Sequence, residues 1–114
     1  MEALKLYDTS AVIELIVKKK VDVIPGLITI FTAIEYPPSV TKAVEILYPT
    51  KDDYALAIKW QVELRKRGTP LPAVDLVIAA MAYNNGLELI TLDKHFTIIQ
   101  EIEPKIRISY TIPI

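Results

Sequence analysis

Residues 72–93 of this 114-residue chain read PAVDLVIAAMAYNNGLELITLD, a helix-forming run followed by a strand-forming run. The apolar segment from Asp75 to Tyr83 predicts a buried helix, and Asn84-Asn85-Gly86 are residue types that end helices. The run from Leu87 to Thr91 predicts a buried strand. One carboxylate, Asp75, therefore stands at the start of a helix, and another, Asp93, closely follows a strand.

Two more elements of the same kind are predicted near the N-terminus. Ala3 to Tyr7 is a short apolar run that stops at Asp8-Thr9-Ser10, whose side chains accept hydrogen bonds from free N–H groups at a helix start. We expect a helix over Ala11 to Val17, ended by Lys18-Lys19-Lys20, because positive charge suits the C-terminal end of the helix dipole. The β-branched run from Leu27 to Phe31 predicts a second buried strand.

The segment after this strand contains a helix signal and a helix breaker. Thr32-Ala33-Ile34-Glu35 matches a capping box, in which the Thr and Glu side chains bind the first N–H groups of a helix. Pro37-Pro38 prevents a long helix through that point, because proline lacks the N–H that a helix interior needs. We therefore expect a new helix that begins near Pro38, runs to Tyr48 and ends at Pro49.

The longest predicted helix begins after Thr50 or Asp52, either of which can cap it, and Gly68 ends it. Its expected apolar stripe consists of Tyr54, Ala55, Ile58, Val62 and Leu64. Beyond Asp93, we expect a short helix or irregular segment from Phe96 to Ile99, and a final strand with Ile106, Ile108 and Tyr110 alternating with polar residues.

This order of strands and helices predicts an α/β fold: a mostly parallel central sheet with helices on both faces, formed by a single domain over residues 1–114. The chain is 52% hydrophobic, which excludes disorder as a description of the whole. A formal charge of -1 excludes the broad basic field of a protein that holds duplex DNA through its phosphates.

The composition also restricts the chemistry. The chain contains no cysteine, which excludes a disulfide framework, a cysteine nucleophile and thiolate metal sites, and its single histidine, His95, excludes a multi-histidine zinc site. We find no membrane-spanning stretch and no signal-peptide pattern, so we expect a soluble cytoplasmic protein.

Four carboxylates are predicted to converge at one edge of the sheet. Asp8, Glu35 and Asp93 follow the first, second and third predicted strands, and Asp75 begins the helix that leads into the third. Because strands and helices alternate in direction, a helix start lies on the same edge as the strand ends, where open α/β sheets bind ligands. Each acid also has a plain structural interpretation as a helix cap or a first-turn acid.

Carboxylate oxygens without histidine or cysteine suit a hard divalent cation, Mg²⁺ or Mn²⁺. A cation held in this way activates water and stabilises the leaving oxygen of a phosphodiester, so a nuclease is a natural use of such a site.

Four segments of the chain resemble the acidic motifs of the PIN domain family. They are Asp8-Thr9-Ser10 after an apolar strand, Thr32 to Glu35, Leu71 to Ala80 around Asp75, and Ile90 to Phe96 around Asp93. Leu71 to Ala80 is the most specific of them. The resemblance covers nearly the whole chain, and the size is similar to that of VapC-type toxins, the ribonuclease half of VapBC toxin–antitoxin pairs.

The resemblance implies a PIN-like three-layer fold and a Mg²⁺- or Mn²⁺-dependent endoribonuclease. Asp8, Glu35, Asp75 and Asp93 would be both the catalytic residues and the metal ligands, with Thr9, Ser10 or Thr91 positioning a carboxylate or a water. The implied partners are RNA as substrate, a VapB-type antitoxin and a second copy in a homodimer. DNA would be contacted only indirectly, through the antitoxin.

This sequence departs from the family pattern in two places. Pro37-Pro38 and the brief segment up to Asp75 suggest a reduced version of the helical hairpin that members often use for antitoxin contact. His95 stands where relatives often have a further acid. Two other hypotheses therefore stay open: a non-catalytic PIN-fold protein-binding module that keeps the acids as helix caps, and a metal-dependent phosphatase with a small-molecule substrate.

Overall fold

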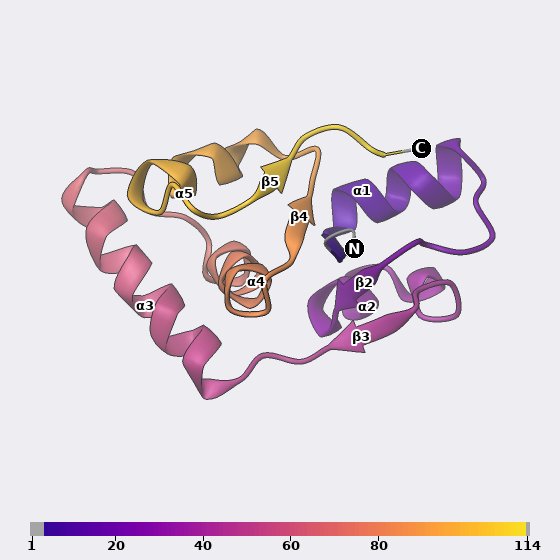
Figure 1. The fold of residues 1–114 in the computed structure, drawn as a ribbon, viewed down its shortest axis with the longest axis horizontal. Coiled ribbons are helices and arrows are strands. Elements are labelled where there is room, and N and C mark those ends of the chain that lie inside the picture. Colours follow the sequence, from indigo (N-terminus) through magenta and orange to yellow (C-terminus); the bar gives the residue numbers. More distant parts are fainter. Residues whose placement is uncertain (1–3, 114) are drawn as a thin grey trace.

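The computed structural model describes residues 4–113, and its centre is a five-stranded, all-parallel sheet (Figure 1). The strand order is β3-β2-β1-β4-β5. The strands are β1 (Lys5–Tyr7), β2 (Leu27–Thr29), β3 (Glu45–Leu47), β4 (Glu88–Ile90) and β5 (Ile108–Ser109).

The helices lie on both faces of this sheet, as predicted. They are α1 (Thr9–Ile13), the π-helix η1 (Glu14–Lys18), α2 (Ile30–Glu35), the 3₁₀ helix η2 (Pro37–Ser39), α3 (Lys51–Lys66), α4 (Ala73–Asn84), the 3₁₀ helix η3 (Lys94–Phe96) and α5 (Thr97–Ile102). No helix within residues 4–113 is both long enough and apolar enough to span a bilayer.

Successive side chains along each strand point to opposite faces of the sheet, so the protein has two separate hydrophobic cores. Leu6 of β1 pairs in register with Leu27 of β2 and Leu89 of β4, and these side chains pack into the core formed with α3, α4 and α5. The next residue, Tyr7, points to the opposite face and packs with residues of α1, η1 and α2, as does Ile90. Helices therefore cover both faces of the sheet in a three-layer α/β arrangement (Figure 1).

The prediction of a helix between Pro38 and Tyr48 is wrong, because residues 45–47 form a strand. Pro37 and Pro38 begin only the short 3₁₀ helix η2, and the chain then forms strand β3, which pairs in parallel with β2. The backbone N–H of Val44 donates to the carbonyl of Gly26 at 3.1 Å, which fixes where the pairing begins. The sequence pattern missed β3 because Glu45 is exposed and Ile46 and Leu47 are only half-buried, so the strand lacks a buried apolar run.

The predicted capping box at Thr32 is also wrong. Strand β2 ends at Thr29, two residues earlier than expected, because the Thr29 hydroxyl accepts the N–H of Thr32 at 3.3 Å and caps helix α2. Thr32 consequently lies inside the helix, and Glu35 is the last helical residue rather than the partner of a cap. The predicted strand at Ala3 begins at Lys5 in the structure, and Ala3 itself lies outside the described residues.

Helix α3 begins and ends as predicted but turns another face inward. Thr50 and Asp53 form a full capping box at its start. The buried side chains are those of Asp53, Ala57, Trp60 and Leu64, which pack toward α4 and the sheet. Most of the expected apolar stripe is exposed instead, namely Tyr54, Ala55, Ile58 and Val62.

Candidate functional site

Asp8 lies at the carboxyl end of the central strand and caps α1. Its Oδ1 atom accepts the backbone N–H of Ala11 at 3.1 Å and the hydroxyl of Ser10 at 2.7 Å. Its Oδ2 atom accepts the hydroxyl of Thr91 at 2.6 Å. The residue is only 6% exposed, so both carboxylate oxygens are held in fixed directions.

The same two hydroxyl groups join the end of β1 to the end of β4. Thr91 is fully buried, and its oxygen accepts the backbone N–H of Asp93 at 2.9 Å while its proton goes to Asp8. The Ser10 oxygen accepts the N–H of Leu92 at 3.0 Å. Asp8 and Asp93 therefore belong to one hydrogen-bonded network that spans two neighbouring strands.

Asp93 is less buried and serves as the cap of η3. Its Oδ1 atom accepts the backbone N–H of His95 at 2.9 Å and lies 2.8 Å from the Nδ1 atom of the His95 ring. The side chains of Asp93 and His95 are 37% and 79% exposed, so solvent reaches both. His95 thus contacts the site through Asp93.

Glu35 is exposed at the end of α2 and is held from α1. The hydroxyl of Thr9 donates to the Oε1 atom of Glu35 at 3.0 Å, and it also lies 3.0 Å from the hydroxyl oxygen of Thr32. Thr32 is fully buried. The sequence pattern predicted Thr32 as a cap and did not indicate this contact, because helix spacing alone does not show that α1 and α2 meet here.

Asp75 lies in the first turn of α4, beside a groove of about 450 Å³. Two of the residues that line the groove carry carboxylates, and the other four are apolar. It is lined by Phe31, Ile34, Glu35, Pro72, Val74 and Asp75. Glu35 and Asp75 therefore share one hollow, although they are forty residues apart in the chain.

Electrostatics link Asp75 to all three other acids. Burial raises the pKa of Asp75, and the charges of Asp93, Asp8 and Glu35 each raise it further, while His95 lowers it. Burial also raises the pKa of Asp8, against hydrogen bonds from Thr91, Ser10 and Ala11 that lower it, and the charge of Asp93 adds to the rise. The structure thus brings the four acids within electrostatic reach of one another.

Tyr110 is a further residue near this edge, and the sequence pattern did not connect it with the four acids. Burial raises the pKa of its hydroxyl, and the negative charge of Asp93 raises it further. Its hydroxyl oxygen is buried and has no hydrogen-bond partner among residues 4–113. The only sequence signal was an apolar alternation typical of a strand, which says nothing about where a hydroxyl group points.

The donor chemistry of the site fits a hard divalent cation. All four side chains offer carboxylate oxygens, and the repulsion from Asp93, Asp8 and Glu35, which adds to burial in raising the pKa of Asp75, is what a bound cation relieves. Within residues 4–113, however, no three acidic or histidine side chains are gathered closely enough to form a ready metal site. The side chains therefore match Mg²⁺ or Mn²⁺ in type and location, and they would have to draw together to bind the cation.

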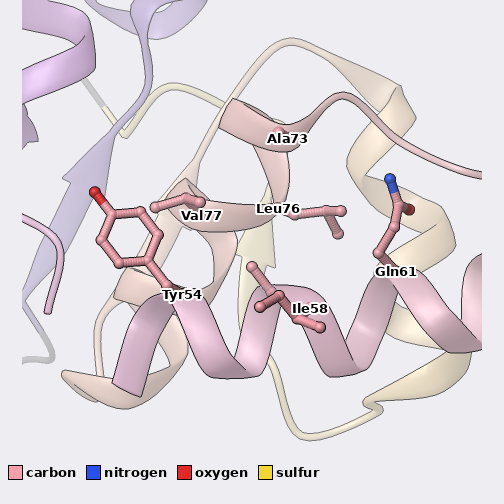
Figure 2. A pocket seen from close by; sticks show the side chains of 7 residues that line it. Tyr54, Ile58, Gln61, Ala73, Leu76 and Val77 are labelled. Carbon is pink, nitrogen blue, oxygen red and sulfur yellow. The ribbon is translucent and has the colours of Figure 1, made fainter. Parts of the chain in front are cut away.

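A second hollow lies between α3 and α4, where Tyr54 and Ile58 face Leu76 and Val77 (Figure 2). Its volume is about 250 Å³. The full lining is Tyr54, Ala57, Ile58, Gln61, Ala73, Leu76 and Val77, which includes no acid and no base. This hollow therefore lacks groups for phosphodiester chemistry, and the candidate site is the acidic edge.

Comparison with a family model described as PIN domain gives a match over residues 38–102. The match includes Asp75 and Asp93, whereas Asp8 and Glu35 precede it. A comparison with curated proteins found no match.

The fold is similar to that of chains in solved VapBC structures. A chain of DNA-bound VapBC from Salmonella typhimurium superposes with a TM-score of 0.72 at 21% identity, covering 93% of this chain and 97% of that one. A chain of VapBC-1 from nontypeable Haemophilus influenzae gives 0.68 at 22% identity, over 93% and 96%. A chain of VapBC-5 from Mycobacterium tuberculosis gives 0.66 at 22%, over 95% and 97%.

Proposed function

The chain belongs to the PIN domain family, and from this premise we propose that it is a metal-dependent endoribonuclease that hydrolyses phosphodiester bonds of RNA. One observation carries the proposal: acids from four separate elements lie within electrostatic reach of one another at the carboxyl edge of the sheet, where burial and the charges of the other three raise the pKa of Asp75. A protein that used these acids only as caps would have no need to bring them together.

In this proposal Asp8, Glu35, Asp75 and Asp93 are the catalytic residues and hold Mg²⁺ or Mn²⁺. The cation, when bound, supplies an activated water and stabilises the charge on the leaving oxygen. The protein supplies the positions of the oxygens: Thr91 and Ser10 fix the Asp8 carboxylate. The expected products carry a 5′-phosphate and a 3′-hydroxyl, because water and not the 2′-hydroxyl of the RNA attacks phosphorus.

We further propose that the chain is the toxin of a type II toxin–antitoxin pair in the cytoplasm. The structures it resembles are described as VapBC, and one is described as a toxin–antitoxin complex from Klebsiella pneumoniae. Its partners would then be a VapB-type antitoxin and a second copy in a homodimer. Contact with DNA would be made through the antitoxin, in keeping with the net charge of -1. We propose residues 1–114 as the single domain that carries the activity.

The test is cleavage of end-labelled single-stranded and structured RNAs by the purified chain, with Mn²⁺ or with EDTA. We compare the wild type with Asp93→Asn and with Asp22→Asn, a control that removes an exposed acid outside the site. We expect Mn²⁺-dependent cleavage that Asp93→Asn lowers by at least about 100-fold and Asp22→Asn leaves unchanged. Cleavage that persists in EDTA or in Asp93→Asn, or products ending in 2′,3′-cyclic phosphate, would contradict the proposed mechanism.

A second candidate function is a non-catalytic binding module. It is favoured by the caps: Asp8 caps α1 and Asp93 caps η3, each by accepting a backbone N–H, so neither acid needs a metal to explain its place. This alternative predicts that divalent cations do not stabilise the fold.

A further inference from the structure

The exposed carboxylate of Glu35 is connected to a buried hydroxyl through one intermediate residue. The hydroxyl of Thr9 on α1 donates to the Oε1 atom of Glu35 at 3.0 Å. The oxygen of the same hydroxyl lies 3.0 Å from the hydroxyl oxygen of Thr32 on α2. Three side chains from two helices therefore form a continuous chain of hydrogen bonds.

The number of hydroxyl protons determines which group donates in each of these hydrogen bonds. A threonine hydroxyl has one proton to donate. Thr9 uses its proton on Glu35, so the bond between the two threonines takes its proton from Thr32. Both O–H dipoles then point toward the carboxylate, an arrangement in which each bond polarises and strengthens the next.

Burial decreases in the same direction, from Thr32 toward the carboxylate of Glu35. Thr32 is fully buried, Thr9 is half-buried and Glu35 is exposed. Thr32 is also anchored through its backbone, since its N–H binds the Thr29 side chain that caps α2. We call the hydrogen-bonded series Thr32–Thr9–Glu35 the relay. Its fixed end is Thr32, and its mobile end is the Glu35 side chain, which has several rotatable bonds.

We propose that Thr32 is a positioning residue that acts through Thr9 to hold the Glu35 carboxylate at the acidic edge beside Asp75. The inference rests on the proposed function for what Glu35 does there, but not for how it is held. Glu35 lies at the end of a two-turn helix and next to Tyr36-Pro37, and no other side chain among residues 4–113 hydrogen-bonds to its carboxylate. Without the relay, the carboxylate would move among rotamers that point into solvent.

Two substitutions separate positioning from a structural role. Thr32→Val keeps the shape and removes the hydroxyl, whereas Thr32→Ser keeps the hydroxyl and removes a buried methyl group. If Thr32 only packs, Thr32→Ser is the more harmful variant. If it positions Glu35, Thr32→Val is the harmful one for function, even where Thr32→Ser melts at a lower temperature. Thr69→Val, which removes the hydroxyl of an exposed threonine on the loop after α3, is the control for the same substitution outside the site.

The first readout is the side-chain conformation of Glu35, measured in the full chain by NMR scalar couplings without metal or RNA. We expect one rotamer in the wild type, in Thr32→Ser and in Thr69→Val, and averaging over several in Thr32→Val. The second readout is the affinity for Mn²⁺, which we expect Thr32→Val to lower about tenfold and Thr32→Ser to preserve. The third is the rate of RNA cleavage, which we expect to follow the affinity.

A double mutant tests whether Thr32 acts through Thr9. In a Thr9→Val background, we expect Thr32→Val to change neither the Glu35 rotamer nor Mn²⁺ binding any further, because the relay is already broken. An unchanged Glu35 rotamer in Thr32→Val, or equal effects of the Val and Ser variants, would overturn the inference. A wild-type chain that does not cleave RNA would contradict the proposed function alone, because the rotamer measurement decides the role of Thr32 independently.

Discussion

Asp75 is a residue whose charge opposes folding. Its pKa is raised above the ordinary value of 3.8 by burial and by Asp93, Asp8 and Glu35, so the folded chain holds the proton more tightly than the unfolded chain. The free energy of unfolding therefore falls as the pH rises from about 3.8 through the raised pKa, and the loss is complete above it.

Asp75→Asn removes this charge at every pH. In EDTA at pH 7 we expect the variant to be more stable than the wild type by up to about 1 kcal/mol, a small gain because the residue is partly exposed to screening solvent. The gain should shrink as the pH is lowered toward 4. Urea denaturation at a series of pH values measures it, with Asp22→Asn as the control. An Asp75→Asn variant less stable than the wild type at pH 7 would contradict the electrostatic account.

For single residues, the sequence predicted which acids form the candidate site but not all of the neighbouring residues that contact them. Asp8 was predicted as a cap from the hydrogen-bonding ability of Asp8-Thr9-Ser10, and the structure confirms the cap. The roles of Thr32 and Tyr110 depend on which residues distant in the chain lie beside them. Local propensity contains no information about such contacts, so these two residues were not predictable in this way.

In helix α3, the sequence pattern predicted where the helix begins and ends but not which face is buried. Thr50, Asp52 and Gly68 predicted its ends, and the structure confirms Thr50 as the cap, with Asp53 completing the capping box, because caps depend on neighbouring residues only. Its inward face depends on α4, which packs against Ala57, Trp60 and Leu64, and apolar residues occur on both faces of the helix. Strand β3 was missed for a related reason: its pairing with β2, and not its own composition, makes it a strand.

The orientation of α3 leads to a matched prediction for two residues on that helix. Leu64 is fully buried and Val62 is 48% exposed. We expect Leu64→Ala to lower the free energy of unfolding by about 2–5 kcal/mol, since it removes buried methyl groups and leaves a cavity. Val62→Ala should change it by no more than about 0.5 kcal/mol. Urea denaturation of both variants measures the difference, and a larger loss for Val62→Ala than for Leu64→Ala would contradict the inward face described here.

For the whole molecule, the four acids come from segments that pack from both sides of the sheet. A cation held by all four would bind the folded chain and not the unfolded one. At 100 times its dissociation constant it would stabilise the fold by about 2.7 kcal/mol. For a domain of this size that corresponds to a rise in melting temperature of about 10 °C or more.

We therefore expect Mn²⁺ to raise the melting temperature of the wild type and of Asp22→Asn, and to raise that of Asp93→Asn much less. Differential scanning calorimetry at constant ionic strength, with K⁺ as the control cation, measures the shifts. Equal melting temperatures with Mn²⁺ and K⁺ in the wild type would favour the non-catalytic binding module over the nuclease.

The loop between α3 and α4 divides the acids into two pairs. Asp8 and Glu35 precede Gly68, and Asp75 and Asp93 follow it. Gly68 is exposed, and the parallel contact between β1 and β4 joins the two parts of the chain across the middle of the sheet. A chain cut at Gly68 would give two fragments that each carry half of the site. Under the proposed function, RNA cleavage by a mixture of the two fragments would report that they have reassociated.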